Sequence, residues 1–386
     1  MIKKYSVFDC NGCHACSNVC PKQCISMKSN EEGFYYPCID ASLCIDCGLC
    51  GKSCPIINNN DNRKTEKNIK AYAAYTNNLD IRLKSSSGGL FTEIASYVIN
   101  NGGIVFGATL NDKLLVEHIA VETIEDLSKL RGSKYIQSII GNTYKEAKMN
   151  LDNNRLVLFT GTPCQISGLY SYLKKDYDNL ITQDIVCHGV PSPMVWKQYL
   201  KYIENKTGST PINVSFRDKR HGWESYSIVV NLENGEEYIE LGKDNMYMKA
   251  FLSDYCLRPS CYNCKFKSKV RTSDFTLADF WGINNILPQF NDQKGTSLVL
   301  VNSDKANKIF KSIDSEITLQ SIDLNLALQY NPSSYKSATM PKKRQAFVKD
   351  IKSMPFDKVI KKYTKPSKIR KLLSRVKNKL IRILNH

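Results

Sequence analysis

A cysteine pattern that occurs twice near the start of this chain restricts its fold more than any other feature. Residues 10–21 and 44–55 both follow the spacing C-x2-C-x2-C-x3-C-P, and the two copies begin 34 residues apart. Such closely spaced cysteines bring several thiols together round one tight turn. A duplicated unit this short buries little core of its own, so we expect it to be stable only when its thiolates hold metal.

This spacing is typical of ferredoxins that carry two [4Fe-4S] clusters. In these proteins three cysteines of one copy hold a cluster, and the fourth cysteine ligates the cluster of the other copy. The pattern predicts one cluster on Cys10, Cys13, Cys16 and Cys54, and a second on Cys20, Cys44, Cys47 and Cys50. Structural zinc is the alternative, but zinc sites usually combine two C-x2-C pairs across a longer loop. Cys24 and Cys38 lie outside the pattern, and we expect both to be small buried side chains.

The charge of the chain is concentrated at one end. The net charge is +17, but 16 of the 54 Lys and Arg residues and only 2 of the 37 Asp and Glu residues lie in residues 341–386. The start, MIKKYSVFDC, lacks the apolar segment of a signal peptide, and 15 cysteines cannot all pair. These features favour a reducing cytoplasm. The absence of a long apolar run predicts no membrane-spanning helix.

Composition divides the chain into four segments. We expect a two-cluster ferredoxin-type domain at residues 1–57, a polar linker at 58–68, a larger domain at 69–340 and a basic tail at 341–386. Apolar runs alternate with helix-length segments in the larger domain, which predicts an α/β fold. Strands are expected at residues 104–109, 114–121, 156–159 and 180–186, and helices at 90–99, 142–151 and 165–173. The predicted fold class is α+β: a small cluster domain, a larger α/β domain and a basic C-terminal helix.

The basic tail has the pattern of an amphipathic helix. From Ser367 onward, apolar residues recur every three or four positions, and Lys and Arg fill most of the rest. Such a helix can lie on an anionic membrane surface. A terminal helix packed on the body or on a partner subunit is the alternative. Tyr363 is the single aromatic residue after Phe356, so we do not expect nucleic acid binding.

A second set of cysteines lies far from the first. Cys256, Cys261 and Cys264 cluster together, and Cys164 and Cys187 stand singly. Three cysteines need a distant partner to complete a four-ligand site, and either single cysteine can supply it. The motifs GTPCQISGL, DIVCHGVPSP, CxxxxCxxC and SDFTLADFWGI follow the N-terminal cluster motifs. Over roughly residues 1–335, the chain resembles the family of coenzyme F420 hydrogenase/dehydrogenase beta subunits.

The resemblance implies an iron–sulfur flavoprotein. Family members move electrons between FAD, iron–sulfur clusters and a hydride carrier such as F420 or a small organic substrate. The resemblance also implies a third [4Fe-4S] cluster on Cys187, Cys256, Cys261 and Cys264. Cys187 is preferred to Cys164 because the matching motif carries its cysteine at a strand end. Zinc ligation, or a buried Cys187 without metal, is the alternative.

Three loops are candidates for flavin binding, and the resemblance places a Gly-Gly pair at the flavin. A Ser/Gly loop before a helix offers N–H groups to a phosphate, a second loop offers cations, hydroxyls and an aromatic ring, and a third follows a strand directly. A helix cap or a solvated loop is the structural alternative. The predicted contacts are Ser87, Gly88, Gly89, Arg131, Ser133, Lys134, Tyr135, Gly161 and Thr162.

Cys164 and His188 are the candidate catalytic residues. Cys164 lies just after a predicted strand, where it can face the flavin or substrate, and His188 can transfer protons. A buried thiol and a histidine bound to backbone are the alternatives. No Walker A or GxGxxG motif is present, so neither a nucleoside triphosphate nor a Rossmann-bound NAD is expected. Asp274 and Asp279 are expected to anchor a loop near the third cluster.

We therefore expect a cytoplasmic oxidoreductase, with its tail on the inner face of the membrane. Its partners are a redox protein or hydride carrier and a small-molecule substrate. An electron-transfer subunit of the ferredoxin type, without its own substrate, is the alternative. A scaffold that keeps its clusters only for folding is a further one.

Overall fold

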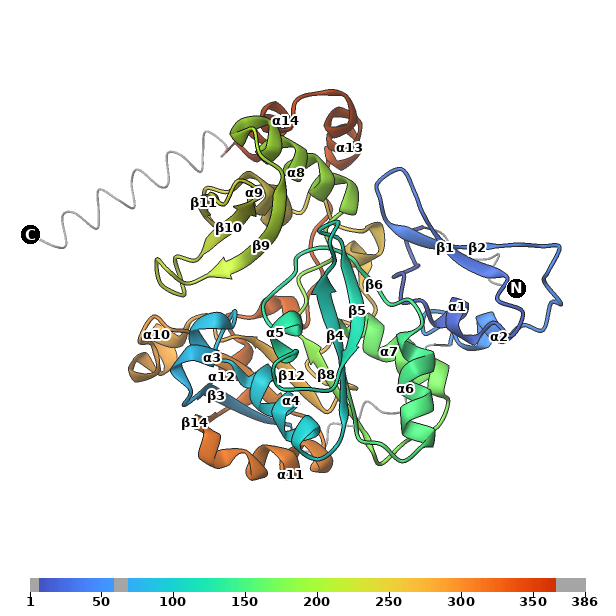
Figure 1. Cartoon of the computed structure of the whole chain (residues 1–386), viewed down its shortest axis with the longest axis vertical. Coiled ribbons are helices and arrows are strands. Elements are labelled where there is room, and N and C mark those ends of the chain that lie inside the picture. The colour runs from blue at the N-terminus through green and yellow to red at the C-terminus, as the bar shows by residue number, and fades with distance from the viewer. Residues whose placement is uncertain (1–6, 59–68, 366–386) are drawn as a thin grey trace, which may run out of the picture.

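The computed structural model describes residues 7–58 and 69–365, which form a small cysteine-rich unit packed on a larger body (Figure 1). The small unit consists of α1 (Ala15–Val19), β1 (Ile25–Ser29), β2 (Tyr35–Ile39) and α2 (Leu49–Lys52). β1 and β2 form an antiparallel hairpin in which Ile25 lies opposite Ile39. Of the eight motif cysteines, Cys16 lies in α1 and Cys50 in α2, and the other six lie in the loops next to these helices.

The two motif copies share an unusual backbone conformation. Gly12 and Asp46, which are equivalent in the repeat, have φ angles of 66° and 50°. His14 and Gly48, also equivalent, have φ angles of 64° and 71° and precede α1 and α2. This left-handed region is costly for most residues, although His and Asp adopt it more often than others. Its recurrence at matching positions shows that the sequence repeat is also a structural repeat.

A nine-stranded mixed sheet forms the centre of the body. Its strand order is β14-β3-β13-β12-β8-β7-β4-β5-β6. The contiguous strands β12, β8, β7 and β4 are mutually parallel, and β13, β3, β14 and β5 pair antiparallel. The strands are β3 (Lys70–Thr76), β4 (Ile104–Leu110), β5 (Val116–Val121), β6 (Ser138–Ile139), β7 (Val157–Gly161), β8 (Leu180–Ile185), β12 (Phe275–Asp279), β13 (Ser297–Val301) and β14 (Ile317–Ile322).

Helices cover both faces of this sheet. α4 (Leu90–Asn100) and α11 (Asp304–Ser312) pack on one face, in a core that includes Val105 and Leu158. α6 (Thr143–Asp152) and α7 (Pro163–Leu173) pack on the other, where Phe106 and Phe159 are fully buried. The alternation follows from strand geometry, because successive side chains point to opposite faces.

A second layer stands beside the sheet. β9 (Pro211–Asp218), β10 (Ser227–Leu232) and β11 (Glu237–Leu241) form an antiparallel sheet in the order β11-β10-β9. α8 (Pro193–Thr207), α9 (Met246–Leu252), α13 (Arg344–Ser353) and α14 (Phe356–Thr364) share one apolar core with it. The first part of the predicted tail thus packs on the body through residues such as Phe347 and Val359. The amphipathic helix predicted from Ser367 lies outside the described residues.

The four strands and three helices predicted from the sequence are all present, with boundaries that shift by a few residues. The remaining elements are short. They are α3 (Leu79–Lys84), α5 (Leu127–Leu130), α10 (Ile283–Ile286), α12 (Leu324–Leu328), η1 (Pro259–Asn263), η2 (Pro288–Phe290), η3 (Asp314–Glu316) and η4 (Pro332–Ser334). Across residues 7–58 and 69–365, no helix has the length and apolar character that crossing a membrane requires.

The small unit rests on α6 and α7 of the body. Ala15 of α1 is fully buried in the core that these helices build, with Cys13 against it. The amide of Asn18 donates a hydrogen bond to the carbonyl of Gly141 at 2.9 Å. A second contact comes from Arg344 of α13, which forms an ion pair with Glu32 of the small unit. Side chains from both ends of the chain therefore fix the small unit in place.

Candidate iron–sulfur sites and the adjoining sheet edge

One pocket of the small unit is lined by the four cysteines predicted for the first cluster. Cys10, Cys13, Cys16 and Cys54 surround it, together with Met27 and Ile56. Burial raises the pKa of Cys13, and the nearby thiols of Cys16, Cys10 and Cys54 raise it further. Four thiols that repel one another's negative charge in an apolar pocket need a cation to hold them as thiolates. A [4Fe-4S] cluster fits this requirement.

A second pocket is lined by the four cysteines predicted for the other cluster, Cys20, Cys44, Cys47 and Cys50. Cys24 also lines it, with its sulfur 3.4 Å from that of Cys20. Cys24 is buried, as the sequence predicted, but Cys38 is exposed, so its predicted burial was wrong. Cys38 lies on β2, and its side chain points to the open face of a hairpin that nothing in the small unit covers.

Within the described residues, no three Cys, His, Asp or Glu side chains are placed to hold a single metal ion. All fifteen cysteines of the chain lie in this part, and none forms a disulfide. A cubane holds its thiolates round four iron atoms, so they stand further apart than the ligands of one ion. Cluster binding therefore does not require a single-ion arrangement of the thiols in the two cysteine-lined pockets.

Sheet topology brings two distant cysteines of the body together. β7 and β8 are adjacent parallel strands, in which Gly161 pairs with Asp184. Cys164 follows Gly161 by three residues, and Cys187 follows Asp184 by three residues. Both cysteines therefore leave the same carboxyl edge of the sheet from neighbouring strands.

Cys261 and Cys264 approach the same place from η1. The backbone amide of Val190, three residues after Cys187, lies 3.4 Å from the sulfur of Cys261. Burial raises the pKa of Cys164, and the thiols of Cys264, Cys187 and Cys261 raise it further. The pKa of Cys187 is likewise raised by burial and by Cys264, against the opposing effect of Lys267. Cys164, Cys187, Cys261 and Cys264 thus form a four-thiol group.

Cys256, a predicted ligand of the third cluster, has a different environment. Its side chain is 1% exposed within the apolar core of the second layer. Burial raises the pKa of Cys256 to about 12, and the charges that modify it belong to Arg344 and Asp254. Both single cysteines, Cys164 and Cys187, which the sequence analysis treated as alternatives, thus belong to the four-thiol group, and Cys256 lies outside it.

His188, the second candidate catalytic residue, is held by two polar side chains. Its Nε2 lies 2.7 Å from a carboxylate oxygen of Asp254, and its Nδ1 lies 3.4 Å from the hydroxyl of Ser333. Its ring meets Phe251 edge-on. These contacts fix the imidazole beside Cys187, and a role in proton transfer remains a prediction.

The three predicted flavin loops meet at the same edge of the sheet. The Ser87 hydroxyl donates to the carbonyl of Thr296, and the Gly88 amide donates to the Ser297 hydroxyl. Ser297 pairs with Asp279 at the carboxyl end of β12. Ser133 donates to the Ser86 hydroxyl at 2.9 Å, which joins the second loop to the first. In open α/β sheets, ligands bind outside the carboxyl ends of the strands.

Several predicted flavin contacts also have structural roles. A Cβ at position 88 would lie 2.4 Å from the carbonyl oxygen of Ala74, and Gly89 has a φ of 90°. The Nζ of Lys134 donates to the carbonyls of Leu130 and Arg131, and burial lowers its pKa to about 7. Thr162 forms a capping box with Gln165 at the start of α7.

Basic residues that the sequence analysis did not identify gather at this edge. Arg217 of β9 pairs with Asp279 at 2.9 Å, although its Nε and Nη2 are buried without a partner among the described residues. Its guanidinium lies 4.1 Å from the ring centre of Tyr226. Lys219 donates to the carbonyl of Ser87. The segment FRDKRHGW, which contains Arg217 and Lys219, matches no sequence motif. The two residues reach the carboxyl edge of the large sheet only because the second layer packs beside it.

Asp274 precedes β12 and Asp279 ends it, so the two lie at opposite ends of the strand and do not anchor one common loop as expected. Asp274 accepts hydrogen bonds from the amide and hydroxyl of Thr182 and from the hydroxyl of Ser303. Asp279 accepts one from the indole of Trp223 at 2.9 Å, besides its ion pair with Arg217. Of the two, Asp279 lies at the carboxyl edge, so it is the residue that shapes the site.

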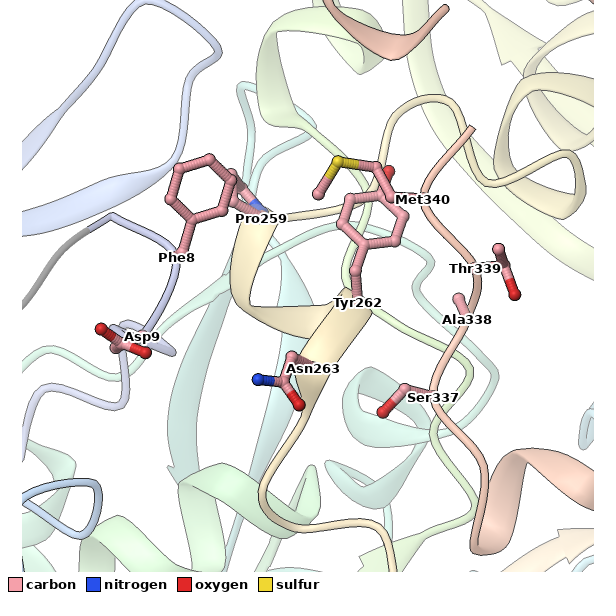
Figure 2. Close-up of a pocket in the computed structure, with 9 residues that line it drawn as sticks. All are labelled: Phe8, Asp9, Pro259, Tyr262, Asn263, Ser337, Ala338, Thr339 and Met340. Atoms are coloured by element: carbon pink, nitrogen blue, oxygen red, sulfur yellow. The ribbon is translucent and has the colours of Figure 1, made fainter. Parts of the chain in front are cut away.

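A larger pocket opens at the surface between the small unit and the body. Its volume is about 540 Å³, and Figure 2 shows Phe8, Tyr262 and Met340 at one end, with Asn263 and Ser337 further along. The lining residues flank two cysteine groups. Phe8 and Asp9 precede Cys10, and Pro259, Tyr262 and Asn263 flank Cys261 and Cys264.

Comparison with known proteins agrees with this architecture. Two family models described as "Coenzyme F420 hydrogenase/dehydrogenase, beta subunit" match the chain, the N-terminal one over residues 71–142 and the C-terminal one over residues 154–325. A third family model, described as "4Fe-4S dicluster domain", matches residues 9–57. The fold and these matches define an iron–sulfur oxidoreductase. The chain belongs to the family of coenzyme F420 hydrogenase/dehydrogenase beta subunits, which confirms the resemblance seen in its motifs.

Curated relatives match the chain in part. It is 26% identical to the F subunit of F(420)H(2) dehydrogenase from Methanosarcina mazei over 165 residues, which are 40% of this chain and 46% of the relative. It is 28% identical to an uncharacterised protein of Methanocaldococcus jannaschii over 200 residues, 44% of this chain and 54% of the relative. The chain spans about half the length of the curated relatives it matches.

One similar solved structure is a component of the F420-reducing [NiFe] hydrogenase complex from Methanosarcina barkeri. The match covers 68% of this chain and 90% of that one, with 17% identity and a TM-score of 0.46.

Proposed function

We propose that this chain is an iron–sulfur flavoprotein that passes electrons between its clusters, a bound FAD and a hydride carrier or small organic substrate. The clusters would supply single-electron transfer, and the flavin would combine two electrons with a proton as a hydride equivalent. The residues proposed to hold three [4Fe-4S] clusters are the two N-terminal sets of four cysteines and the group Cys164, Cys187, Cys261 and Cys264.

The placement of α7 is the observation that carries this proposal. Cys164 lies in its first turn, and Gly168, four residues later, lies on the same face. A Cβ at position 168 would lie 3.1 Å from the sulfur of Cys13. One face of one helix therefore connects the first N-terminal pocket with the cysteine group of the body. This closeness gives electrons a direct route between the two units.

The proposed flavin site is the carboxyl edge beside that group. The loops that contain Ser86 and Ser133 are joined there, and two guanidinium nitrogens of Arg217, Nε and Nη2, are buried without a partner among the described residues. A buried guanidinium with unused donors suits a phosphate or another anionic group. Gly161 and Thr162 at the end of β7 complete this edge.

An electron-transfer subunit without its own flavin is a second candidate function. It is favoured by the hydrogen bonds that already occupy the Gly88 amide and the Lys134 ammonium. In that case the loops serve the fold, and electrons leave the protein at the surface pocket.

We propose that an electron carrier approaches through the pocket of Figure 2, because its walls flank ligands of two cysteine groups. Replacing Phe8, which is 54% exposed, by Ser should slow reduction by the carrier without changing iron content. An unchanged rate would place the approach elsewhere.

Anaerobic purification with iron, sulfide and flavin measured together tests the proposed function. Three cubanes give about 12 iron atoms per chain, because each holds four. About 12 iron atoms with one FAD supports the flavoprotein. The same iron content without flavin supports the second candidate, and about eight iron atoms would contradict the third cluster.

A further inference from the structure

Arg258 combines complete burial with the absence of a carboxylate partner. It is 1% exposed, and it lies in the segment between Cys256 and Cys261. Its guanidinium donates to the carbonyls of Cys10 and Tyr35, at 2.8 and 3.0 Å, and to the amide oxygen of Gln137 at 3.3 Å. No Asp or Glu among the described residues forms an ion pair with it. A buried charge without a counter-charge costs several kcal/mol.

One further partner of Arg258 can carry negative charge. Its Nη2 lies 3.8 Å from the sulfur of Cys10. The ring of Tyr36 covers the guanidinium, 4.1 Å from its carbon, and helps to keep water away. If Cys10 ligates a cluster, four thiolates give that cluster a net negative charge at the guanidinium. The burial of Arg258 is then explained, because its charge is balanced by the metal site.

The same residue also reaches the cysteine group of the body. The backbone carbonyl of Arg258 accepts a hydrogen bond from the amide of Cys261 at 2.9 Å. A Cβ at Gly12, between Cys10 and Cys13, would lie 3.0 Å from Nη1 of Arg258, so its side chain fits against the first motif copy. Arg258 thus contacts one proposed ligand of each of two clusters, through its side chain and its backbone.

We propose that Arg258 is the positioning residue that sets the reduction potential of the cluster held by Cys10, Cys13, Cys16 and Cys54. Net charge and hydrogen bonds to the ligand sulfurs are among the main determinants of such potentials. A fixed positive charge favours the reduced cluster, which carries one more electron, and so raises the potential. This inference rests on the proposed cluster ligation and adds the residue that tunes it.

The test compares Arg258→Gln, which removes the charge, with Arg258→Lys, which keeps it. Each variant of the full chain is purified anaerobically, and its clusters are titrated potentiometrically and followed by electron paramagnetic resonance. We expect Arg258→Gln to keep its iron and to show one cluster with a more negative midpoint potential. The other clusters are internal references, and Arg258→Lys should stay close to the wild-type value.

Arg344→Gln is the matched control. Arg344 also reaches from the body to the small unit and is buried, but its partner is Glu32 and not a cysteine. Its loss should leave the cluster potentials unchanged.

Each outcome decides the proposal. Unchanged potentials in Arg258→Gln would overturn it, and so would loss of iron from both Arg258 variants, because Arg258 would then be needed only for folding. Loss of iron from the Gln variant alone would support a requirement for the charge. Wild-type protein without iron at Cys10 would instead refute the proposed function, and iron analysis distinguishes that case.

Discussion

The small unit and the body bring cysteines together in opposite ways. In the small unit, eight proposed ligands come from two short repeats, and each repeat holds its thiols on a tight turn with left-handed residues at matching positions. In the body, four cysteines spread from Cys164 to Cys264 meet because β7, β8 and η1 end near one another. The cysteines of the small unit are already close together in the sequence, whereas those of the body come together only after the sheet has formed.

This difference determines what each cysteine site depends on. A local motif remains recognisable wherever the chain places it, and it folds round its metal. A site built by topology depends on strand order and on the packing of distant helices. The following predictions test whether the two regions behave in these different ways.

Loss of one ligand in the small unit should have the largest effect. Cys16→Ser and Cys50→Ser, at equivalent repeat positions, should each lower iron content by about four atoms per chain, since each cubane holds four. Cys16→Ser should also weaken the packing of the small unit on α7. Iron analysis and limited proteolysis measure both effects. Cys38→Ser, at an exposed cysteine, is the control and should keep all its iron.

The cysteine group of the body should respond to Cys164 and not to Cys256. Cys164→Ser is expected to remove about four iron atoms per chain and to leave the N-terminal clusters in place. Cys256→Ser should keep its iron, because this side chain is buried in an apolar core. The opposite pattern would restore the ligand set that the family resemblance implied.

Gly12→Ala should damage the first motif copy more than Gly48→Ala damages the second. A Cβ at Gly12 would lie 2.6 Å from the amide nitrogen of Gln137, and the φ of 66° adds strain. Overpacking of this kind typically costs about 1–3 kcal/mol. Chemical denaturation of the intact protein measures the loss. Gly48→Ala in the second copy is the matched control, since its φ is 71° but an added Cβ would meet nothing within 4 Å. An equal loss there would contradict overpacking as the cause.

His118 should make the body sensitive to acid. Burial lowers the pKa of His118 to about 4, whereas an unfolded histidine titrates near 6.5. Between these values the unfolded chain binds a proton that the folded chain does not, so stability falls as the pH drops from about 6.5 towards 4. At pH 5 the loss is about 2 kcal/mol.

His118→Gln should remove that share of the pH dependence. The variant and the wild type are compared by anaerobic urea unfolding at pH 7 and pH 5. If the free energy of unfolding falls equally in both proteins between pH 7 and pH 5, protonation of His118 does not destabilise the fold. His118 contacts the hydroxyl of Ser138 and the carbonyl of Thr160, so the amide of Gln keeps a polar partner for these groups.

The contrast between local and topological assembly also sets the limits of sequence reasoning. The N-terminal pockets, the α/β alternation and the family were predictable, because spacing and hydrophobic periodicity are local properties. Cys38 was misjudged because burial depends on what covers a hairpin. Spacing offered Cys164 and Cys187 as alternatives, because only the parallel pairing of Gly161 with Asp184 brings both cysteines to the same edge of the sheet.

Two buried arginines of the body were missed for the same reason. Arg217 and Arg258 carry no motif, and a charged residue between cysteines has no distinctive pattern. Their importance appears only when burial is seen together with the absence of enough partners. A buried cation with too few hydrogen-bond or charge partners is a structural signal that no sequence pattern contains.

The α7 helix works as a fixed spacer. The four residues of helix from Cys164 to Gly168 span about 6 Å. Gly168, in the middle of α7, lies against Cys13. Electron tunnelling falls steeply with distance, and a helix does not stretch. Small movements of the hairpin or of the surface loops would therefore leave the gap between the two proposed cluster sites unchanged, and a bulkier side chain at position 168 would widen it.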